Sequence, residues 1–114
     1  MDVINRAVAV IKPRQPYLDW AKSIPGPADD VTLDEVRTDC TAILIPDFDD
    51  PAEAEAFIAT IAGDLFEMEL DSWDRDPRTW PVNRSYAIFR EWFDVEIHSI
   101  VLDASDDDLI REAY

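Results

Sequence analysis

The sequence predicts an α+β fold, with a small, three-stranded, mostly antiparallel sheet and helices packed on one of its faces. The chain has 114 residues, of which 47% are apolar and 11% aromatic, and this suits one domain with one core. Short apolar runs that end at prolines indicate strands, and longer stretches with apolar residues at helical spacing indicate helices. These elements do not alternate regularly, as they would in a doubly wound parallel sheet. We therefore expect residues 1–114 to form a single domain.

A β-branched run that ends at Pro13 predicts the first strand, and its central residues are Val8, Val10 and Ile11. Pro16 then begins a helix, which the prolines and glycine of residues 25–27 stop. The apolar stripe of this helix consists of Tyr17, Trp20, Ala21 and Ile24. Thr32 and Glu35 have the spacing of a capping box, which predicts a short helical turn through Arg37.

The uninterrupted apolar run 41–45 predicts a second strand, closed by Pro46. Because its residues are apolar at every position, we expect this strand to be central or buried on both faces. Asp50 is a strong N-cap, and Pro51 occupies the first helical position after it. The main helix is therefore expected over residues 51–70, with apolar residues at Ala54, Phe57, Ile58, Ile61, Leu65 and Met68.

The C-terminal third predicts an irregular connector, a helix, a strand and a last short helix. The third major helix is outlined by Val82, Tyr86, Phe89 and Phe93, and the strand covers residues 94–102. Side chains alternate along a strand, so Val95, Ile97, Ser99 and Val101 form its expected core face. The opposite face carries Glu96, His98, Ile100 and Leu102. Ser105, with Asp108 three residues later, predicts the last helix by capping.

The formal net charge of −16 is distributed unevenly along the chain. Residues 1–26 and 75–93 each carry four basic and two acidic side chains. Residues 27–74 carry fifteen acids and one arginine, and residues 94–114 carry seven acids and one arginine. This pattern predicts one negative face and one mixed or positive face, although a solvated acidic coat that maintains solubility explains it too. Either arrangement argues against nucleic-acid binding, which needs basic side chains to neutralise phosphates.

The sequence indicates a cytoplasmic protein that does not enter a membrane. The longest uncharged apolar run, residues 7–11, is far shorter than the roughly 20 residues that span a bilayer. The N-terminus has no apolar segment typical of a secretory signal. Cys40 is the only cysteine, and it has no partner for a disulfide.

His98 is the only histidine, and Glu96 lies on the same face of the predicted strand. Together with Lys12 or Arg14 of the first strand, this pair could serve a small enzyme or a ligand-binding domain. The alternative is a polar pair on an open sheet surface.

The sequence predicts no metal site and no cofactor. The acids at residues 47–50 begin like a calcium loop, but the sixth position has no glycine and the twelfth no glutamate. Both this cluster and residues 106–108 lie where helix N-termini favour acids. The two glycines, Gly26 and Gly63, form no phosphate-binding loop.

Cations and large aromatic residues recur in the less acidic segments, as they do in protein interfaces. They are Lys12, Arg14, Tyr17, Trp20, Trp73, Trp80, Arg84 and Trp92. They would form one surface if the first helix meets the connector 73–84. The alternative is that the tryptophans belong to the core or cover it.

Two segments carry a resemblance to a known family. Residues 6–20 read RAVAVIKPRQPYLDW, and residues 91–99 read EWFDVEIHS. Both are similar to segments of a family of short hypothetical bacterial proteins. The resemblance implies a bacterial, cytoplasmic protein, and it carries no activity or catalytic residue with it.

These observations favour a non-enzymatic acidic module that binds a protein partner. A basic partner, such as a toxin or a nucleic-acid-binding protein, would be steered to the acidic segments, and a DNA mimic is the extreme form of this idea. The enzyme or ligand-binding alternative depends on a pocket around Glu96 and His98. A homodimer is a third possibility, because Ile100 and Leu102 are expected on the sheet face opposite the core.

Overall fold

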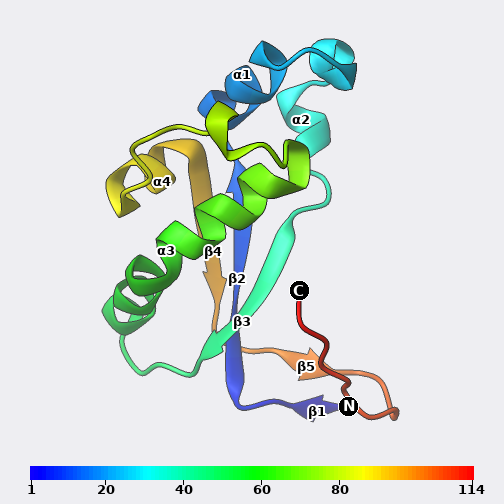
Figure 1. Ribbon diagram of the computed structural model, residues 1–114. Helices are drawn as coiled ribbons and strands as arrows, with labels where there is room; N and C mark the ends of the chain where they lie inside the picture. The colour runs from blue at the N-terminus through cyan, green and yellow to red at the C-terminus, as the bar shows by residue number, and fades with distance from the viewer.

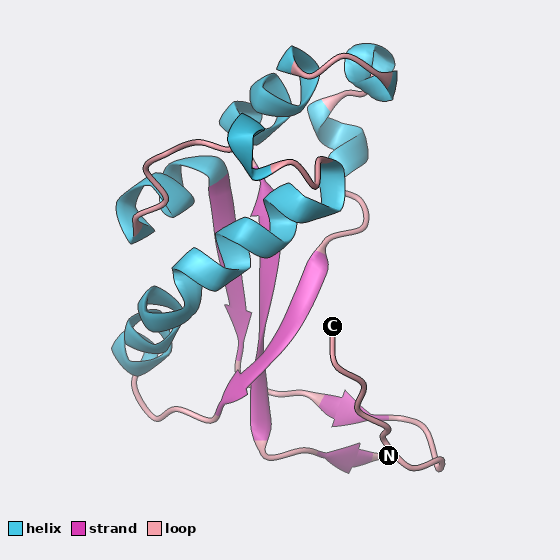
Figure 2. Cartoon of the chain, in the orientation of Figure 1, coloured by secondary structure: helices cyan, strands magenta, loops and turns pink.

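The computed structural model covers residues 1–114, apart from the side chain of Pro27. It is an α+β domain in which a three-stranded sheet is joined to a two-stranded ribbon (Figures 1 and 2). In chain order the elements are β1 (Asp2–Val3), β2 (Arg6–Pro13), α1 (Gln15–Ser23), the 3₁₀ helix η1 (Pro27–Asp30), α2 (Leu33–Val36), β3 (Thr41–Pro46), α3 (Pro51–Trp73), the 3₁₀ helix η2 (Pro77–Thr79), α4 (Tyr86–Trp92), β4 (Phe93–His98) and β5 (Leu102–Asp103). No helix of the described residues is both long and apolar enough to cross a membrane.

The main sheet has the order β3-β2-β4, and both pairings are antiparallel. The predicted α+β class and antiparallel sheet are therefore confirmed. The expectation that strand 41–45 is central was wrong, since β3 is an edge strand and β2 lies between its neighbours. Ala42 and Leu44 are exposed on the uncovered face, while Ile45 is buried. A continuous apolar run thus formed a strand with only one buried face.

The strand β2 determines which face of the sheet is covered. Its residues alternate strictly, with Ala7, Ala9, Ile11 and Pro13 buried and the residues between them partly exposed. The small side chains of Ala7 and Ala9 allow a close approach to the covered face, which α3 crosses (Figure 1). The opposite face, here called the open face, has no helix over it.

The start of α3 follows the sequence prediction. The Asp50 side chain accepts a hydrogen bond from the Ala52 amide at 3.0 Å, and Pro51 is the first helical residue. The helix continues three residues beyond the expected end, to Trp73. Thr32 caps α2 in the same way, by accepting a hydrogen bond from the Glu35 amide.

Aromatic side chains from α1, α3, α4 and β4 interlock in the core. Phe66 of α3 is fully buried, and its ring centroid lies 5.9 Å from that of Phe89, 5.3 Å from Trp92 and 5.7 Å from Phe93. Tyr17 of α1 extends the cluster, with its ring 5.2 Å from Phe93. Such tilted and edge-to-face pairs stabilise a core beyond the area that they bury.

The predicted helix through Val82 and Phe93 is shorter in the structure. Val82 is 96% exposed in an irregular segment, and α4 starts only after Ser85, whose side chain caps the Ile88 amide. Phe93 is already the first residue of β4. The apolar spacing extended past both ends of α4 because Val82 does not pack and Phe93 packs from a strand.

The predicted strand 94–102 is divided into two pieces. β4 ends at His98, and β5 forms separately and pairs with β1, with Val3 opposite Leu102. Ile100 and Leu102 therefore lie on the connection and on the ribbon, and not on the open face of the main sheet. They are 72% and 54% exposed.

The predicted C-terminal helix from Ser105 is absent, because residues 104–114 contain no helix or strand. The Ser105 hydroxyl accepts a hydrogen bond from the Asp107 amide, so the capping signal produces only a local turn. Leu109 and Ile110 are largely exposed, so little apolar burial is present there to stabilise a helix. Short helices depend on such packing, since their nucleation is costly.

Candidate functional site

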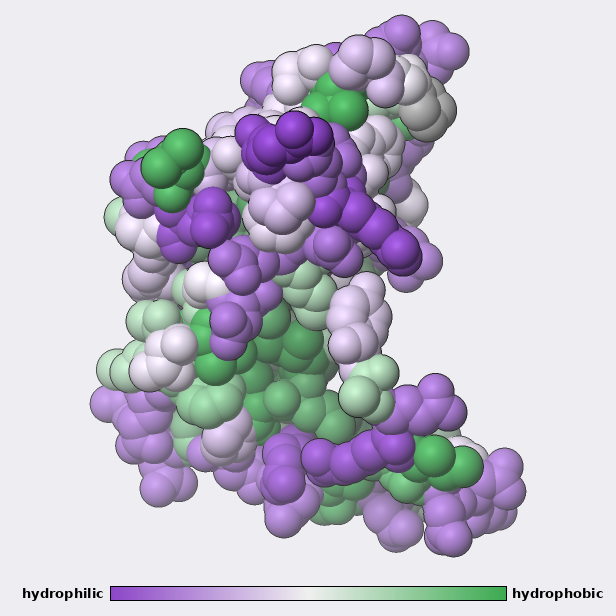
Figure 3. Space-filling model, viewed as in Figure 1, coloured by the Kyte–Doolittle hydropathy of each residue, from purple (hydrophilic) through white to green (hydrophobic). Residues whose placement is uncertain are grey.

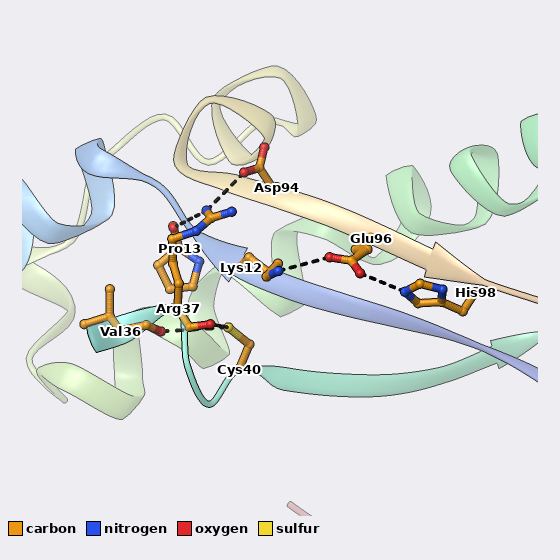
Figure 4. Close-up of polar contacts among 8 residues, drawn as sticks. All are labelled: Lys12, Pro13, Val36, Arg37, Cys40, Asp94, Glu96 and His98. Carbon is orange, nitrogen blue, oxygen red and sulfur yellow. Dashed lines mark hydrogen bonds and ion pairs between the residues drawn. The ribbon is translucent and has the colours of Figure 1, made fainter. Parts of the chain in front are cut away.

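The open face of the sheet brings together three of the predicted site residues. Lys12 Nζ lies 3.1 Å from Glu96 Oε2, and His98 Nε2 lies 2.8 Å from Glu96 Oε1 (Figure 4). The register explains the contact, because Glu96 lies opposite Val10 and its neighbours on the same face are Lys12 and His98. The hydrogen bond from His98, followed by that from Lys12, lowers the pKa of the Glu96 carboxyl. Glu96 and His98 are exposed, so this is a solvated row of charges and not a pocket.

Arg14, which the sequence grouped with Glu96 and His98, takes a different partner. Its Nε is 3.8 Å from Asp94 Oδ1, and its Nη1 donates to the Arg90 carbonyl at 2.8 Å. Arg37 approaches the same carboxylate, with Nη1 3.0 Å from Asp94 Oδ2, and it also donates to the Pro13 carbonyl at 2.8 Å (Figure 4). These contacts fasten α2 to the end of β2 and β4.

The first helix meets the connector 73–84, which was the condition for a shared surface of cations and aromatic residues. Trp20 Nε1 of α1 donates to the Thr79 carbonyl at 2.9 Å. Trp20 is itself buried, as is Tyr17, while Trp73, Trp80 and Trp92 are half-buried against the core. Arg84 lies over the Trp80 ring at 5.9 Å. The aromatic residues therefore act mainly as core and cover, and they leave only partial surfaces for a partner.

The charges of the less acidic segments are largely neutralised by neighbouring acids. Six of the ten basic residues form ion pairs with five carboxylates, and the pairs are Lys12–Glu96, Arg14–Asp94, Arg37–Asp94, Arg78–Asp76, Arg84–Glu67 and Arg90–Glu55. Within the described residues, 21 of the 26 acids thus stand outside ion pairs with Lys or Arg, against four basic residues. Pairing leaves the net charge unchanged, but it leaves few basic side chains free to interrupt the unpaired acids.

A cavity of about 210 Å³ opens between α1, α3 and the segment that joins α2 to β3. It is lined by Ile11, Pro13, Tyr17, Val36, Asp39, Cys40, Thr41, Glu69 and Trp73. We call it the Glu69 cavity, because its most unusual group is the carboxyl of Glu69. Glu69 Oε1 is buried and has no hydrogen-bond partner among the described residues. Burial raises the pKa of Glu69, and the Thr41 side chain offsets part of the rise.

Two other polar groups of the Glu69 cavity, on Tyr17 and Cys40, are satisfied by the backbone. The Tyr17 hydroxyl donates to the Glu69 carbonyl at 2.8 Å, and burial raises the pKa of Tyr17 to about 12. The Cys40 thiol lies 3.5 Å from the Arg37 carbonyl and 3.8 Å from that of Val36 (Figure 4). Burial also raises the pKa of Cys40, which keeps it a thiol and makes it a poor nucleophile.

A second cavity, of about 380 Å³, is lined by the Glu55 carboxylate, which already has hydrogen-bond donors. Glu55 Oε2 accepts from the Tyr86 hydroxyl at 2.6 Å and from Arg90 Nη1 at 2.9 Å. The apolar wall of this cavity comes from Phe48, Pro51, Val95 and Ile97. Its carboxylate is already paired, so only the smaller Glu69 cavity holds an acceptor that lacks a donor.

The ribbon end of the molecule, formed by β1, β5 and residues 104–114, exposes large apolar side chains. They are Met1, Val3, Leu102, Leu109, Ile110 and Tyr114, with Ile100 beside them. In Figure 3, a few hydrophobic residues show among hydrophilic ones on this end, and the broadest hydrophobic area lies over the middle of the molecule. Hydrophilic residues cover much of the opposite, helical end, which comprises α1, η1, α2 and the last turns of α3. The molecule measures 45 × 30 × 26 Å, so these ends are well separated.

Sequence reasoning did not identify Glu69 or Asp39 as site residues. A signal was present, because Glu69 lies four residues after the buried Leu65 and hence on the apolar side of α3. A charged residue at such a position is either paired or functional. The signal was hidden by the acidic composition of the whole segment.

Within the described part of the chain, no group of three or more His, Cys, Asp or Glu side chains is arranged to hold a metal ion. Asp50 of the first acidic cluster is the N-cap of α3, as capping predicts.

No protein-family model, curated protein or solved structure gives a significant match to this chain.

Proposed function

We propose that this protein is a non-enzymatic acidic module that binds a basic protein partner at its helical end. The excess of carboxylates outside ion pairs carries the proposal. Such an excess creates a field that attracts basic proteins over a Debye length of about 8–10 Å at physiological salt. It speeds their association and selects against acidic competitors.

Acids are concentrated from η1 to the segment after α2, as they also are over residues 47–55. Asp29, Asp30, Asp34, Glu35 and Asp39 are all exposed in the first of these segments. The only basic residue between them, Arg37, turns its guanidinium to Asp94 and the Pro13 carbonyl. The surface that remains is negative, which favours a basic partner over a second copy of the same end.

The enzyme alternative has less support from the geometry. Lys12, Glu96 and His98 do come together, but they lie on the open face, and none of them lines the two cavities described above. Catalysis benefits from a site that excludes water and holds its groups in a fixed geometry. A solvated row of side chains on a sheet provides neither.

Two matched charge variants test the proposal. The helical-end variant replaces four acids, in the form D29N/D30N/D34N/E35Q. The ribbon-end variant removes the same charge, in the form D106N/D107N/D108N/E112Q. Each protein is immobilised, a native lysate is passed over it, and the retained proteins are identified by mass spectrometry at about 50 mM and about 200 mM salt.

We expect the unaltered protein and the ribbon-end variant to retain the same basic protein at low salt and to release it at higher salt. The helical-end variant should retain it about tenfold less strongly, which corresponds to ~1.4 kcal/mol. Retention that is insensitive to salt, or a retained partner that is acidic, would contradict a basic partner. An equal loss in both variants would contradict the helical end as the binding surface.

A further inference from the structure

The Glu69 cavity contains an acceptor that the chain itself does not satisfy. Glu69 Oε1 is buried without a hydrogen-bond partner, although a buried carboxyl oxygen without a donor costs free energy. The Tyr17 hydroxyl and the Cys40 thiol donate to backbone carbonyls instead. Neither Glu69 nor Asp39 takes part in an ion pair within the described residues.

The nearest cations are also engaged elsewhere. Lys12 Nζ is held by Glu96 on the open face, and the Arg37 guanidinium is held by Asp94 and the Pro13 carbonyl (Figure 4). Moving either of them to Glu69 would break contacts that join β2 to β4 or to α2. Within the described residues, no basic side chain is therefore placed to neutralise the Glu69 carboxyl.

The walls of the cavity suit a cation on an apolar stem. Tyr17 and Trp73 provide aromatic surfaces, over which ammonium and guanidinium groups bind favourably. Ile11, Pro13 and Val36 provide aliphatic surface for methylene groups. The volume of about 210 Å³ is below the roughly 300–1,000 Å³ of pockets for drug-sized ligands.

We propose that the Glu69 cavity receives one lysine or arginine side chain, whose cationic head pairs with the Glu69 carboxyl while its methylene stem packs between the cavity walls. The inference rests on the proposed function, since the side chain would belong to the basic partner that docks at the helical end. Asp39, exposed at the mouth of the cavity, adds a second negative charge on the path of entry. The cavity then supplies the selective contact, and the surrounding acids supply the long-range attraction.

The probes for this proposal are the N-acetyl amides of lysine, arginine and norleucine, titrated into the isotopically labelled protein. The readouts are the NMR shifts of the Trp73 indole N–H and of the amides of residues 39–41. Norleucine has an aliphatic side chain without the charge, so it separates recognition of the cation from simple apolar binding. The lysine and arginine arms show which cationic head the cavity prefers.

We expect at least one cationic amide to bind with a Kd of about 1 mM, and norleucine amide to bind at least tenfold more weakly. Glu69→Gln keeps the size of the side chain, removes its charge and should weaken the cationic amide at least tenfold. Asp71→Asn removes a charge from an exposed position of the same helix and should leave binding unchanged. Asp39→Asn, outside the core, should weaken binding less than Glu69→Gln does.

The proposal is overturned if no cationic amide shifts these signals in the unaltered protein, or if norleucine amide binds equally well. It is also overturned if Glu69→Gln and Asp71→Asn have the same effect. In each case a basic partner could still be retained by the unaltered protein and lost by the helical-end variant. The failure of the cavity would thus be distinguished from a failure of the proposed function.

Discussion

Beneath the helices, aromatic side chains interlock, whereas at the ribbon end apolar side chains face solvent. Phe66, Phe89 and Phe93 are fully buried beneath the helices. By contrast, no residue of β1, β5 or 104–114 is buried. The chain thus places its stability in one part and leaves the other part held by a few backbone hydrogen bonds.

The contrast shows that the apolar content of this chain has two uses. Most of the aromatic residues pack in or against the core at the covered face of the sheet, and this core stabilises the fold. The exposed apolar residues of the ribbon end contribute little to this core, because a two-stranded ribbon is marginally stable by itself. An exposed group of this kind marks an interaction surface more often than a structural one.

The largest test of this contrast compares one substitution from each end. Phe66→Ala should lower the free energy of unfolding by about 3–5 kcal/mol, because it opens a cavity among three aromatic rings. Leu102→Ala, on the ribbon, should change it by less than about 0.5 kcal/mol. Urea denaturation measures both values. Similar losses for the two variants would show that the ribbon belongs to the folded core.

The elements predicted well from sequence are those decided by local chemistry. Asp50 and Pro51 specify the start of α3 through one side-chain hydrogen bond and one restricted φ angle, and both depend only on neighbours in sequence. The edge position of β3 depends instead on which strands pair with β2, and apolarity at every position does not reveal it. Ser105 shows the converse, since its capping signal is present but nothing packs against the helix that it would start.

The candidate site also has one part that the sequence predicts and one part that depends on tertiary packing. The contact of Glu96 with His98 follows from alternation along one strand, and its contact with Lys12 follows from antiparallel pairing. The Glu69 cavity is assembled from α1, α3, β2 and the segment before β3, which are far apart in sequence. Its existence depends on packing, and composition gave no indication of it.

The second prediction concerns association of the ribbon end with a second copy of the chain. We expect a weak dimer at high micromolar concentration, in which exposed strand edges and apolar residues of two ribbons meet. Leu102→Lys should weaken it about tenfold, or ~1.4 kcal/mol. Salt should strengthen this dimer, because it screens the repulsion between two chains of charge −16, while it weakens binding of a basic partner.

Sedimentation equilibrium at low and high salt measures this association. The matched control is Val82→Lys, since Val82 is exposed and lies between η2 and α4, outside the ribbon. A protein that remains monomeric at both salt concentrations would rule out the dimer. An equal effect of Val82→Lys would place the contact elsewhere.

The third prediction concerns how the buried Glu69 carboxyl lowers the stability of the folded protein at neutral pH. Burial raises its pKa above the ordinary value, so the neutral form is favoured in the folded protein. Stability from this group is fully present below the ordinary pKa of a glutamate, about 4.3, and is lost as the pH rises through the raised pKa. Glu69→Gln should therefore be more stable than the unaltered protein by on the order of 1 kcal/mol at pH 7 and equally stable near pH 4.

Urea denaturation at the two pH values measures the difference. Asp71→Asn is the control, because it removes a charge from an exposed site on the same helix, and its effect should not follow the titration of Glu69. If Glu69→Gln were less stable at pH 7, the carboxylate would be a satisfied group and the cavity would lack its open acceptor.

The smallest effect is expected at Glu96, where the environment acts in the opposite sense. Here the hydrogen bonds from His98 and Lys12 favour the charged form, and they lower the pKa of a fully exposed carboxyl. His98→Ala should move the pKa of Glu96 upward toward its ordinary value, and Lys12→Ala should do so less, since His98 is the larger cause. NMR detection of the Glu96 carboxyl carbon during a pH titration measures the change, and no resolvable loss of stability is expected at neutral pH.

A Glu96 that titrates normally in the unaltered protein would show that the contacts of Glu96 with His98 and Lys12 do not persist in solution. A lowered pKa at Glu96 together with a raised one at Glu69 would instead establish that hydrogen bonding at Glu96 and burial at Glu69, more than the net charge of the chain, decide how each carboxyl behaves.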